Sequence, residues 1–226
     1  MLTFLNRLRN IKTVALHDAE SYGVLTAVRI LAYHILRWAC SFNTFLAVEL
    51  RLADVNPEFL QLPNDLTGRF LTTDEIEAIP TDPNLETSVE FVLDVLGRSD
   101  LCYGIFQDKA LIAYGWYSRI PTPIDEHLMF YFPETHVYMY KGFTLKSHRG
   151  RRLHAYVMAL ALEKFTAEGY VGLASFVLAD NIRSVRSCAR LGYRFFGRIY
   201  TARLFNRMYI FATPSCKRKM FVFKQI

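Results

Sequence analysis

The spacing of hydrophobic and polar positions in the second half of the chain predicts strands and helices in alternation. Runs rich in β-branched and aromatic residues indicate strands, and a run with apolar positions every three to four residues indicates a helix. A shorter helix begins at Asp180 or Asn181, which are good cap residues, and ends at Gly192. The predicted order is strand 135–145, helix 153–168, strand 170–178, helix 181–191 and a strand beginning at 193–196.

Shorter elements are predicted in the first half, giving a strand-rich α/β domain. Thr72 or Thr73 is the expected cap of a short helix that Pro80 closes. Residues 120–133 contain several prolines and are predicted to form a loop or irregular strand near the substrate. The other predicted elements are a strand at 44–52, helices at 73–79 and 87–96, hairpin strands at 101–106 and 110–117, a basic turn at 216–219 and a last strand at 220–223.

The N-terminal residues form a separate part of the predicted organisation, a helical extension over 1–43 before the domain at 44–226. No small-residue cleavage site follows an apolar core here, so a secretory signal is not expected. The apolar segment 22–40 is interrupted by Arg29, His34 and Arg37, which argues against a membrane span. It is either a helix packed on the domain or on a partner subunit, a helix on an anionic membrane surface, or a wall of the substrate cavity.

Composition and charge narrow the function classes. The four cysteines are scattered without a Cys-x-x-Cys pair, which favours reduced thiols in a cytoplasmic protein over a disulfide framework or zinc site. The net charge is +6, and arginines dominate the chain beyond residue 140. No nucleic-acid-binding signature accompanies them, so nucleic acid is not an expected partner. A phosphate-bearing cofactor accounts for the charge near residue 149, and a solvated arginine face accounts for the rest.

The stretch 144–154 carries the clearest chemical signal. It joins the strand at 135–145 to the helix at 153–168, and it contains Gly150 between Arg149 and two further arginines. The first N–H groups of a helix have no intrahelical partner, and the helix dipole favours negative charge there. Arginine side chains add charge that suits a diphosphate. We therefore predict an anion site at this loop.

Together with the later stretch Asn181 to Leu191-Gly192-Tyr193, this loop resembles the GNAT superfamily of acyl-CoA-dependent N-acyltransferases, over roughly residues 45–211. The resemblance implies a GNAT-like mixed, mostly antiparallel central sheet flanked by helices, an α/β (α+β) fold. It also implies acetyl-CoA or another acyl-CoA as co-substrate, without a metal. In that family the backbone amides of the loop hold the diphosphate of coenzyme A.

The loop matches the family pattern at some positions and departs from it at others. Arg149 matches its first position, Gly150 a glycine common at the second, and Leu153 the apolar fifth. Arg152 stands where the family usually has Gly, and His154 where it has Gly or Ala, so a side chain at 152 either crowds the diphosphate or pairs with it. The resemblance implies these cofactor-binding residues: Phe143, Thr144, Leu145, Arg149, Gly150, Arg151, Arg152, Leu153, His154, Asn181, Ser184 and Ser187.

Amide formation needs a neutral amine and a leaving thiolate, so it benefits from a base and an acid. Many family members place a tyrosine that acts as the acid four residues before the glycine that ends this helix, here Gly192. Cys188 occupies that position in this chain. Its thiol either donates a proton to the leaving thiolate or fills the face of the helix. Glu134, His136 and Tyr138 alternate along the strand into the loop and are the candidate base or water-positioning groups.

Three function classes follow. The first is a cytoplasmic N-acyltransferase, most simply an acetyltransferase, acting on an amine of a small molecule. The second is an acyltransferase that takes a long acyl chain from coenzyme A or an acyl carrier protein at a membrane surface, which segment 22–40 and the aromatic content motivate. The third is an idle module that binds coenzyme A or a partner. The sequence names neither the acceptor nor the oligomeric state, and a homodimer stays open.

Overall fold

The computed structural model describes residues 41–204 and 207–226, together with Leu25, Val28 and Ala32. The predicted helical extension at 1–43, with its contacts through 22–40, lies almost entirely outside the described residues. Among the residues that are described, no helix is both long enough and apolar enough to cross a bilayer.

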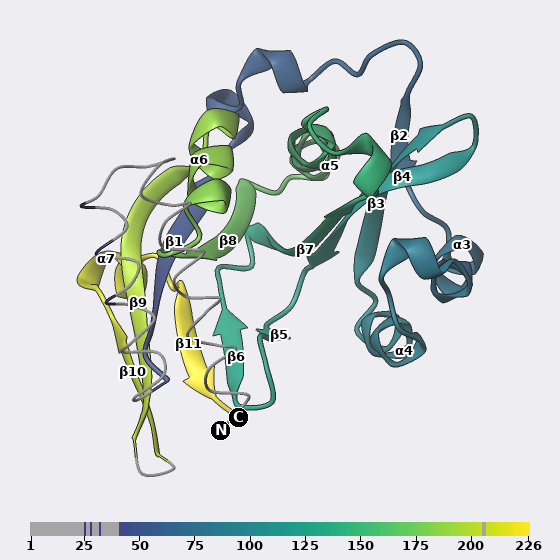
Figure 1. Ribbon diagram of the computed structural model, residues 1–226. Coiled ribbons are helices and arrows are strands. Elements are labelled where there is room, and N and C mark those ends of the chain that lie inside the picture. The colour runs from purple at the N-terminus through teal and green to yellow at the C-terminus, as the bar shows by residue number, and fades with distance from the viewer. Residues whose placement is uncertain (1–24, 26–27, 29–31, 33–40, 205–206) are drawn as a thin grey trace.

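A large twisted sheet runs through the molecule (Figure 1). Its neighbouring strands are antiparallel except for β7 and β8, the one parallel pair among the described strands. The mixed, mostly antiparallel central sheet predicted above is therefore confirmed. In spatial order its strands are β10 (Arg207–Ala212), β9 (Arg194–Leu204), β1 (Asn43–Leu50), β8 (Gly172–Leu178), β7 (His136–Thr144), β4 (Ala110–Ser118), β3 (Leu101–Gln107) and β2 (Thr67–Phe70).

A second, smaller sheet corrects the sequence prediction for the region before β7. Residues 120–133, predicted as a loop or irregular strand, contain β5 (Thr122–Pro123) and β6 (Leu128–Tyr131), which join β11 (Val222–Gln225). The predicted turn at 216–219 is wrong over most of its length, because α7 (Pro214–Arg218) is a helix there. Pro214 occupies its first turn, where a fixed φ and a missing N–H cost nothing.

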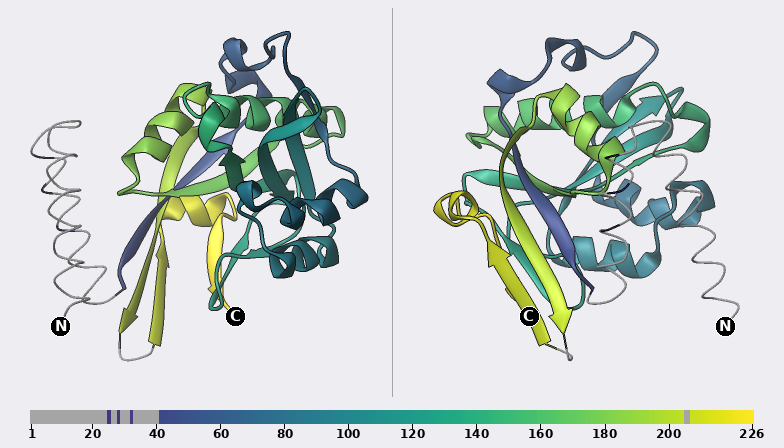
Figure 2. Two further views of the ribbon diagram at one scale, coloured as in Figure 1. Left: turned by 45° about the vertical axis from the view of Figure 1, so that its right-hand side comes forward. Right: turned by 60° about the vertical axis from the view of Figure 1, so that its left-hand side comes forward.

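Helices cover both faces of the large sheet (Figure 2). One face carries α5 (Leu153–Ala167) and α6 (Ile182–Leu191), and the other carries α3 (Thr73–Ala78), α4 (Val89–Gly97) and the second sheet. Short 3₁₀ turns complete the described elements: η1 (Leu52–Asp54), η2 (Pro57–Phe59), η3 (Ile79–Thr81), η4 (Pro83–Leu85) and η5 (Lys146–His148).

The predicted helix ends are confirmed by their caps. The Thr72 side chain accepts from the Glu75 amide, and the Glu75 carboxylate reaches back to the Thr72 amide, forming a capping box. The Asn181 side chain accepts from the Ser184 amide at 3.2 Å, and Gly192 ends α6 at φ 113°.

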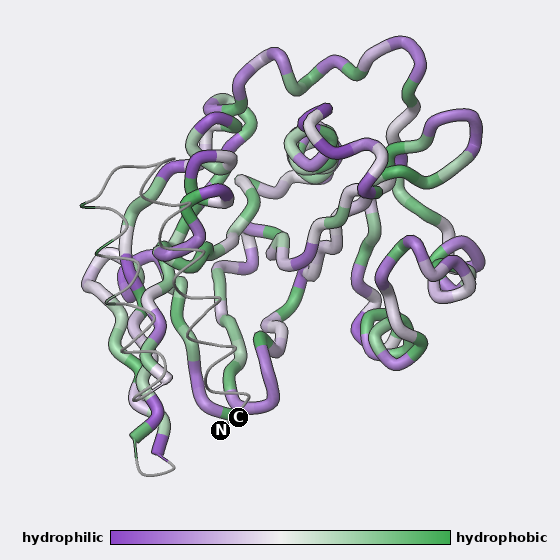
Figure 3. Tube along the Cα trace, in the orientation of Figure 1, coloured by the Kyte–Doolittle hydropathy of each residue, from purple (hydrophilic) through white to green (hydrophobic). Residues whose placement is uncertain are grey.

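The hydrophobic core divides according to the two faces of the sheet. Alternate side chains such as Val137 and Met139 of β7 pack beneath α5, whereas Tyr138 points to the opposite face, under the second sheet. A third cluster around Trp116 lies beneath α3 and α4. Figure 3 shows the hydrophobic positions concentrated in the strands and hydrophilic residues along the segment between β7 and α5.

Candidate active site

The parallel strands β7 and β8 separate part-way along their length. Their pairing runs from His136 opposite Gly172 to Tyr138 opposite Ala174 and stops there. On the other edge of β7, Trp116 pairs with Lys141 and Tyr117 pairs with Met139, so β7 has one extra residue, Tyr140. Such a bulge bends its strand and raises the local twist. The bulge therefore coincides with the point where β7 leaves β8.

A cleft of about 400 Å³ occupies this opening between the strands. The Ser175 hydroxyl donates to the Met139 carbonyl at 2.8 Å across the gap, where ladder pairing has ended. Residues from α5 and α6 line one side, and Tyr140 and Phe176 line the side toward the other face of the sheet. Its lining is Met139, Tyr140, Gly142, His154, Met158, Ser175, Phe176, Val177, Arg183, Ser184, Ser187, Cys188 and Tyr193.

The loop before α5 presents a run of free backbone donors beside this cleft. The amides of residues 150–154 donate no hydrogen bond to a backbone or side-chain acceptor within the described part of the chain. Gly150 at φ 86° and Arg152 at φ 58° both have left-handed backbone, a conformation that occurs in anion-binding nests. Such nests and helix N-termini bind phosphate oxygens. Free donors of this kind suit an anion, and the anion site at this loop stays a prediction.

The arginines of the loop have protein partners. Arg152 pairs with Glu58 at 3.0 Å, and Arg151 pairs with Asp65 at 3.0 Å. Arg149 Nε donates to the Thr144 carbonyl at 3.4 Å. Both acids come from the segment between β1 and β2, and no sequence pattern associates that segment with the loop. All of these side chains are substantially exposed, so the pairs can exchange for a bound anion at small cost.

The remaining predicted cofactor residues fall into three groups. Ser184, Ser187 and His154 line the cleft, and the His154 ring lies so close to Gly142 that a Cβ there would approach its Cε1 to 2.1 Å. Burial lowers the pKa of His154, so this ring is neutral near pH 7. Asn181 caps α6, and Phe143 stacks on a neighbouring ring of β4. Thr144 ends β7, Leu145 follows it, and Leu153 begins α5.

Cys188 lies on α6 with its side chain buried at the wall of the cleft. Burial raises the pKa of its thiol to about 11. An ordinary alkyl thiol such as that of coenzyme A has a pKa near 8.5, so proton transfer from Cys188 to the departing thiolate is uphill by roughly two pKa units. This difference favours the packing role for Cys188 over the acid role.

Cys188→Ser is expected to lower the free energy of unfolding by about 1–3 kcal/mol, because it buries an unpaired hydroxyl. The rate per folded molecule should stay unchanged. Urea unfolding and thiol release from acetyl-CoA measure the two effects. Cys102→Ser is the matched control, since Cys102 is fully buried but remote from the cleft. A tenfold fall in rate at full stability would make Cys188 a proton donor instead.

The three candidate bases lie away from the cleft lining. Glu134 precedes β7 and is exposed, so it does not share the buried face of the strand. His136 is engaged at both nitrogens: Nε2–H donates to the Glu49 carboxylate at 2.9 Å, and Nδ1 accepts from the Thr135 hydroxyl at 3.0 Å. Burial lowers the pKa of His136. Tyr138 is buried under the second sheet, and burial strongly raises its pKa. Their catalytic roles stay predictions.

The Glu49 carboxylate of β1 forms hydrogen bonds with side chains from the residue after β1, from β7 and from the segment after α7. It is 1% exposed and contacts Arg51, His136 and Lys219, the last of which follows α7. Burial alone would raise its pKa, but the hydrogen bonds from Lys219, His136 and Arg51 together outweigh burial and hold the pKa at about 2. The charged carboxylate therefore stabilises the folded state.

Glu49→Gln is expected to lower the free energy of unfolding by about 3 kcal/mol at pH 7. Because the folded pKa lies below the usual 4.5, the contribution is fully present above pH 4.5 and is lost as the pH falls toward 2. Urea unfolding between pH 7 and pH 2 should show the wild type converging on the variant. Glu75→Gln is the control: its pKa is also about 2, but its side chain is 36% exposed, so its loss should be smaller. A pH-independent difference for Glu49→Gln contradicts the assignment.

Several proteins of solved structure are similar to this chain. The chain is similar to a Drosophila protein of solved structure at 18% identity, covering 82% of this chain and 59% of that one, with a TM-score of 0.46. It is similar to an N-acetyltransferase-like protein from Streptococcus suis at 15% identity, covering 78% of this chain and 68% of that one, with a TM-score of 0.48. It is also similar to a GNAT-family acetyltransferase from Colwellia psychrerythraea at 15% identity, covering 76% of this chain and 61% of that one, with a TM-score of 0.49. The chain thus spans about three fifths of the first of these proteins. No curated protein sequence matches it.

The fold defines a mixed α/β protein with an anion cradle beside an opened parallel strand pair. The model of the acetyltransferase (GNAT) family matches residues 68–193, and the chain belongs to that family. Its members typically transfer an acyl group from acyl-CoA to an amine of a small molecule or a protein. No group of residues suited to hold a metal ion occurs in the described part of the chain.

Proposed function

We propose that this protein binds acetyl-CoA and transfers the acetyl group to a primary amine of a small molecule. The observation that carries the proposal is the run of free backbone amides at residues 150–154, directly beside the cleft between β7 and β8. The amides receive the diphosphate, with Arg149, Arg151 and Arg152 adding positive charge. The thioester arm enters the opening beyond Tyr138.

Catalysis in this proposal comes mainly from positioning. Where β7 and β8 have separated, their backbone groups no longer pair with each other, and an extended pantetheine arm can lie between them. The arm brings the thioester carbon to the level of the Tyr140 bulge, where an amine can approach from the opposite face. Holding both reactants in line accounts for much of the rate in bimolecular transfers.

Calorimetric titration with coenzyme A, acetyl-CoA and palmitoyl-CoA tests the cofactor assignment. Thiol release with a panel of amines (spermidine, kanamycin, glucosamine and a peptide with a free N-terminus) tests the transfer. We expect coenzyme A and acetyl-CoA to bind with similar affinity and at least one amine to raise thiol release above hydrolysis. Much tighter binding of palmitoyl-CoA would favour the long-chain alternative, and binding without turnover would favour the idle module. Absence of binding refutes the proposal.

A further inference from the structure

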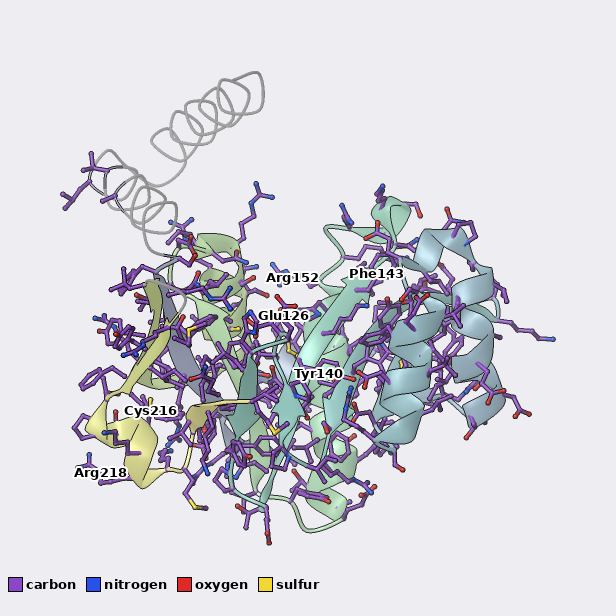
Figure 4. All side chains as sticks on the ribbon, turned by 90° about the horizontal axis from the view of Figure 1, so that it is seen from below. Glu126, Tyr140, Phe143, Arg152, Cys216 and Arg218 are labelled. Carbon is purple, nitrogen blue, oxygen red and sulfur yellow. The ribbon has the colours of Figure 1, made fainter. Side chains whose placement is uncertain are left out.

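Tyr140 occupies a distinctive position in the sheet. It is the extra residue of the β7 bulge, and it lines the cleft. Its ring packs against the cluster under the second sheet and also against the cluster under α3 and α4. Figure 4 shows Tyr140 near the middle of the molecule, between these two parts. It therefore lies where the cleft meets the face of the sheet opposite α5.

The Tyr140 hydroxyl is held by a charged network. It donates to Asp100 Oδ2 at 3.0 Å, and Arg98 donates to the same oxygen through Nε at 2.9 Å and Nη2 at 2.8 Å. Arg98 also pairs with Asp94. The Asp100 side chain is 1% exposed, and its Oδ1 is buried without a hydrogen-bond partner among the described residues. A buried carboxylate oxygen without a partner is rare and calls for an explanation.

This network fixes what the hydroxyl can do. Its proton points to Asp100, so the oxygen lone pairs are left to accept a hydrogen bond from another donor. Burial and then the charge of Asp100 raise the pKa of Tyr140, so the phenol stays neutral at working pH. With one guanidinium between two carboxylates, Asp94 and Asp100, the network carries a net negative charge.

We propose that Tyr140 receives the acceptor amine, its oxygen accepting a hydrogen bond from the attacking N–H, and that Asp100 and Arg98 are positioning residues for that hydroxyl. This inference rests on the proposed function and adds to it the residue that receives the amine in the cleft and the two residues that hold it in place. The negative network favours an amine over a hydroxyl acceptor, because a neutral amine becomes cationic during attack, whereas a hydroxyl has to lose its proton as it attacks.

The transfer balances without a further reactant. The nitrogen lone pair forms the C–N bond at the thioester carbon, and the nitrogen becomes positively charged near the Asp100 network. Its proton then passes to water in the cleft. The C–S bond breaks, its electron pair leaves with sulfur, and the thiolate takes a proton from water. Tyr140 keeps its own proton throughout and orients the nitrogen.

Tyr140→Phe removes only the hydroxyl and keeps the ring. With acetyl-CoA and the amine from the panel that gives the fastest thiol release, we expect kcat/KM for the amine to fall at least tenfold, mainly through a higher KM. The calorimetric Kd for acetyl-CoA should stay within twofold. Asp100→Asn should shift the amine KM in the same direction, with acetyl-CoA binding retained. Tyr114→Phe is the control, since it deletes a hydroxyl in the cluster under α3 and α4 but outside the cleft lining.

The outcomes separate this inference from the proposed function. Acetyl-CoA binding and amine turnover that are unchanged in Tyr140→Phe overturn the role of Tyr140 and leave the proposed function intact. An equal loss in Tyr140→Phe and Tyr114→Phe also overturns it, because the effect then reports cluster packing. A wild type that binds acetyl-CoA but neither binds nor acetylates any amine of the panel overturns the amine site and leaves only the cofactor site. A wild type without acetyl-CoA affinity removes both.

Discussion

Replacing Gly192 by alanine is expected to lower the free energy of unfolding by about 3 kcal/mol or more. Gly192 ends α6 at φ 113°, and a Cβ there would lie 1.9 Å from the Asp54 carbonyl oxygen. That oxygen belongs to the backbone after β1, which is tied to α6 because the Asn56 amide donates to the Leu191 carbonyl at 3.0 Å. The clash cannot be relieved by rotating a side chain. Urea unfolding measures the loss.

Gly169→Ala is the matched control for this effect. Gly169 also follows a helix with left-handed backbone, at φ 97°, but a Cβ there would meet nothing within 4 Å. Only the backbone strain remains, which costs roughly 1–2 kcal/mol. Similar losses in the two variants would show that the crossing of α6 by the segment after β1 is not a tight contact.

Helix ends were the most predictable part of this fold, because their signals are local. Thr72, Asn181 and Gly192 act within three or four residues of their own positions, so the sequence alone locates the ends of α3 and α6. The apolar strand runs around the loop before α5 are also local. They predicted β7, α5 and β8 in the order that the structure has.

The second sheet depended on a pairing that local signals do not contain. Val222 pairs with Tyr131 across more than ninety positions, and β5 is only two residues long. Prolines in this region indicate a loop when the partner strand is unknown. A short strand next to the C-terminal end of the chain was therefore predicted as irregular.

The candidate site also combines features with local sequence signals and features that depend on long-range contacts. The free amides at residues 150–154 were predictable, since the first N–H groups of a helix have no intrahelical partner. Tyr140 becomes an extra residue only through the register of β4, and Asp100 reaches it from forty positions away. The acids Glu58 and Asp65 approach the loop from more than eighty positions away. None of these three contacts has a local sequence signature.

Gly150→Asp is expected to weaken coenzyme A binding at least a hundredfold, which corresponds to about 3 kcal/mol. A Cβ at Gly150 would meet nothing within 4 Å, so the fold has room for the side chain, although the backbone at φ 86° is strained for it. The new carboxylate would stand among the free amides of residues 150–154 and repel the diphosphate. Calorimetric titration with coenzyme A measures the loss, which should shrink as salt screens the repulsion.

Two variants isolate the cause of that loss. Gly150→Asn has nearly the same shape without the charge and tolerates left-handed backbone, so its affinity should fall far less. Gly169→Asp places the same carboxylate on an equally left-handed backbone, φ 97°, with equally open surroundings but beyond the far end of α5. Its affinity should equal that of the wild type. An unchanged Kd in Gly150→Asp would remove the loop from the cofactor site. Equal losses in the Asp and Asn variants would mean that the shape of the cradle, rather than repulsion, determines binding.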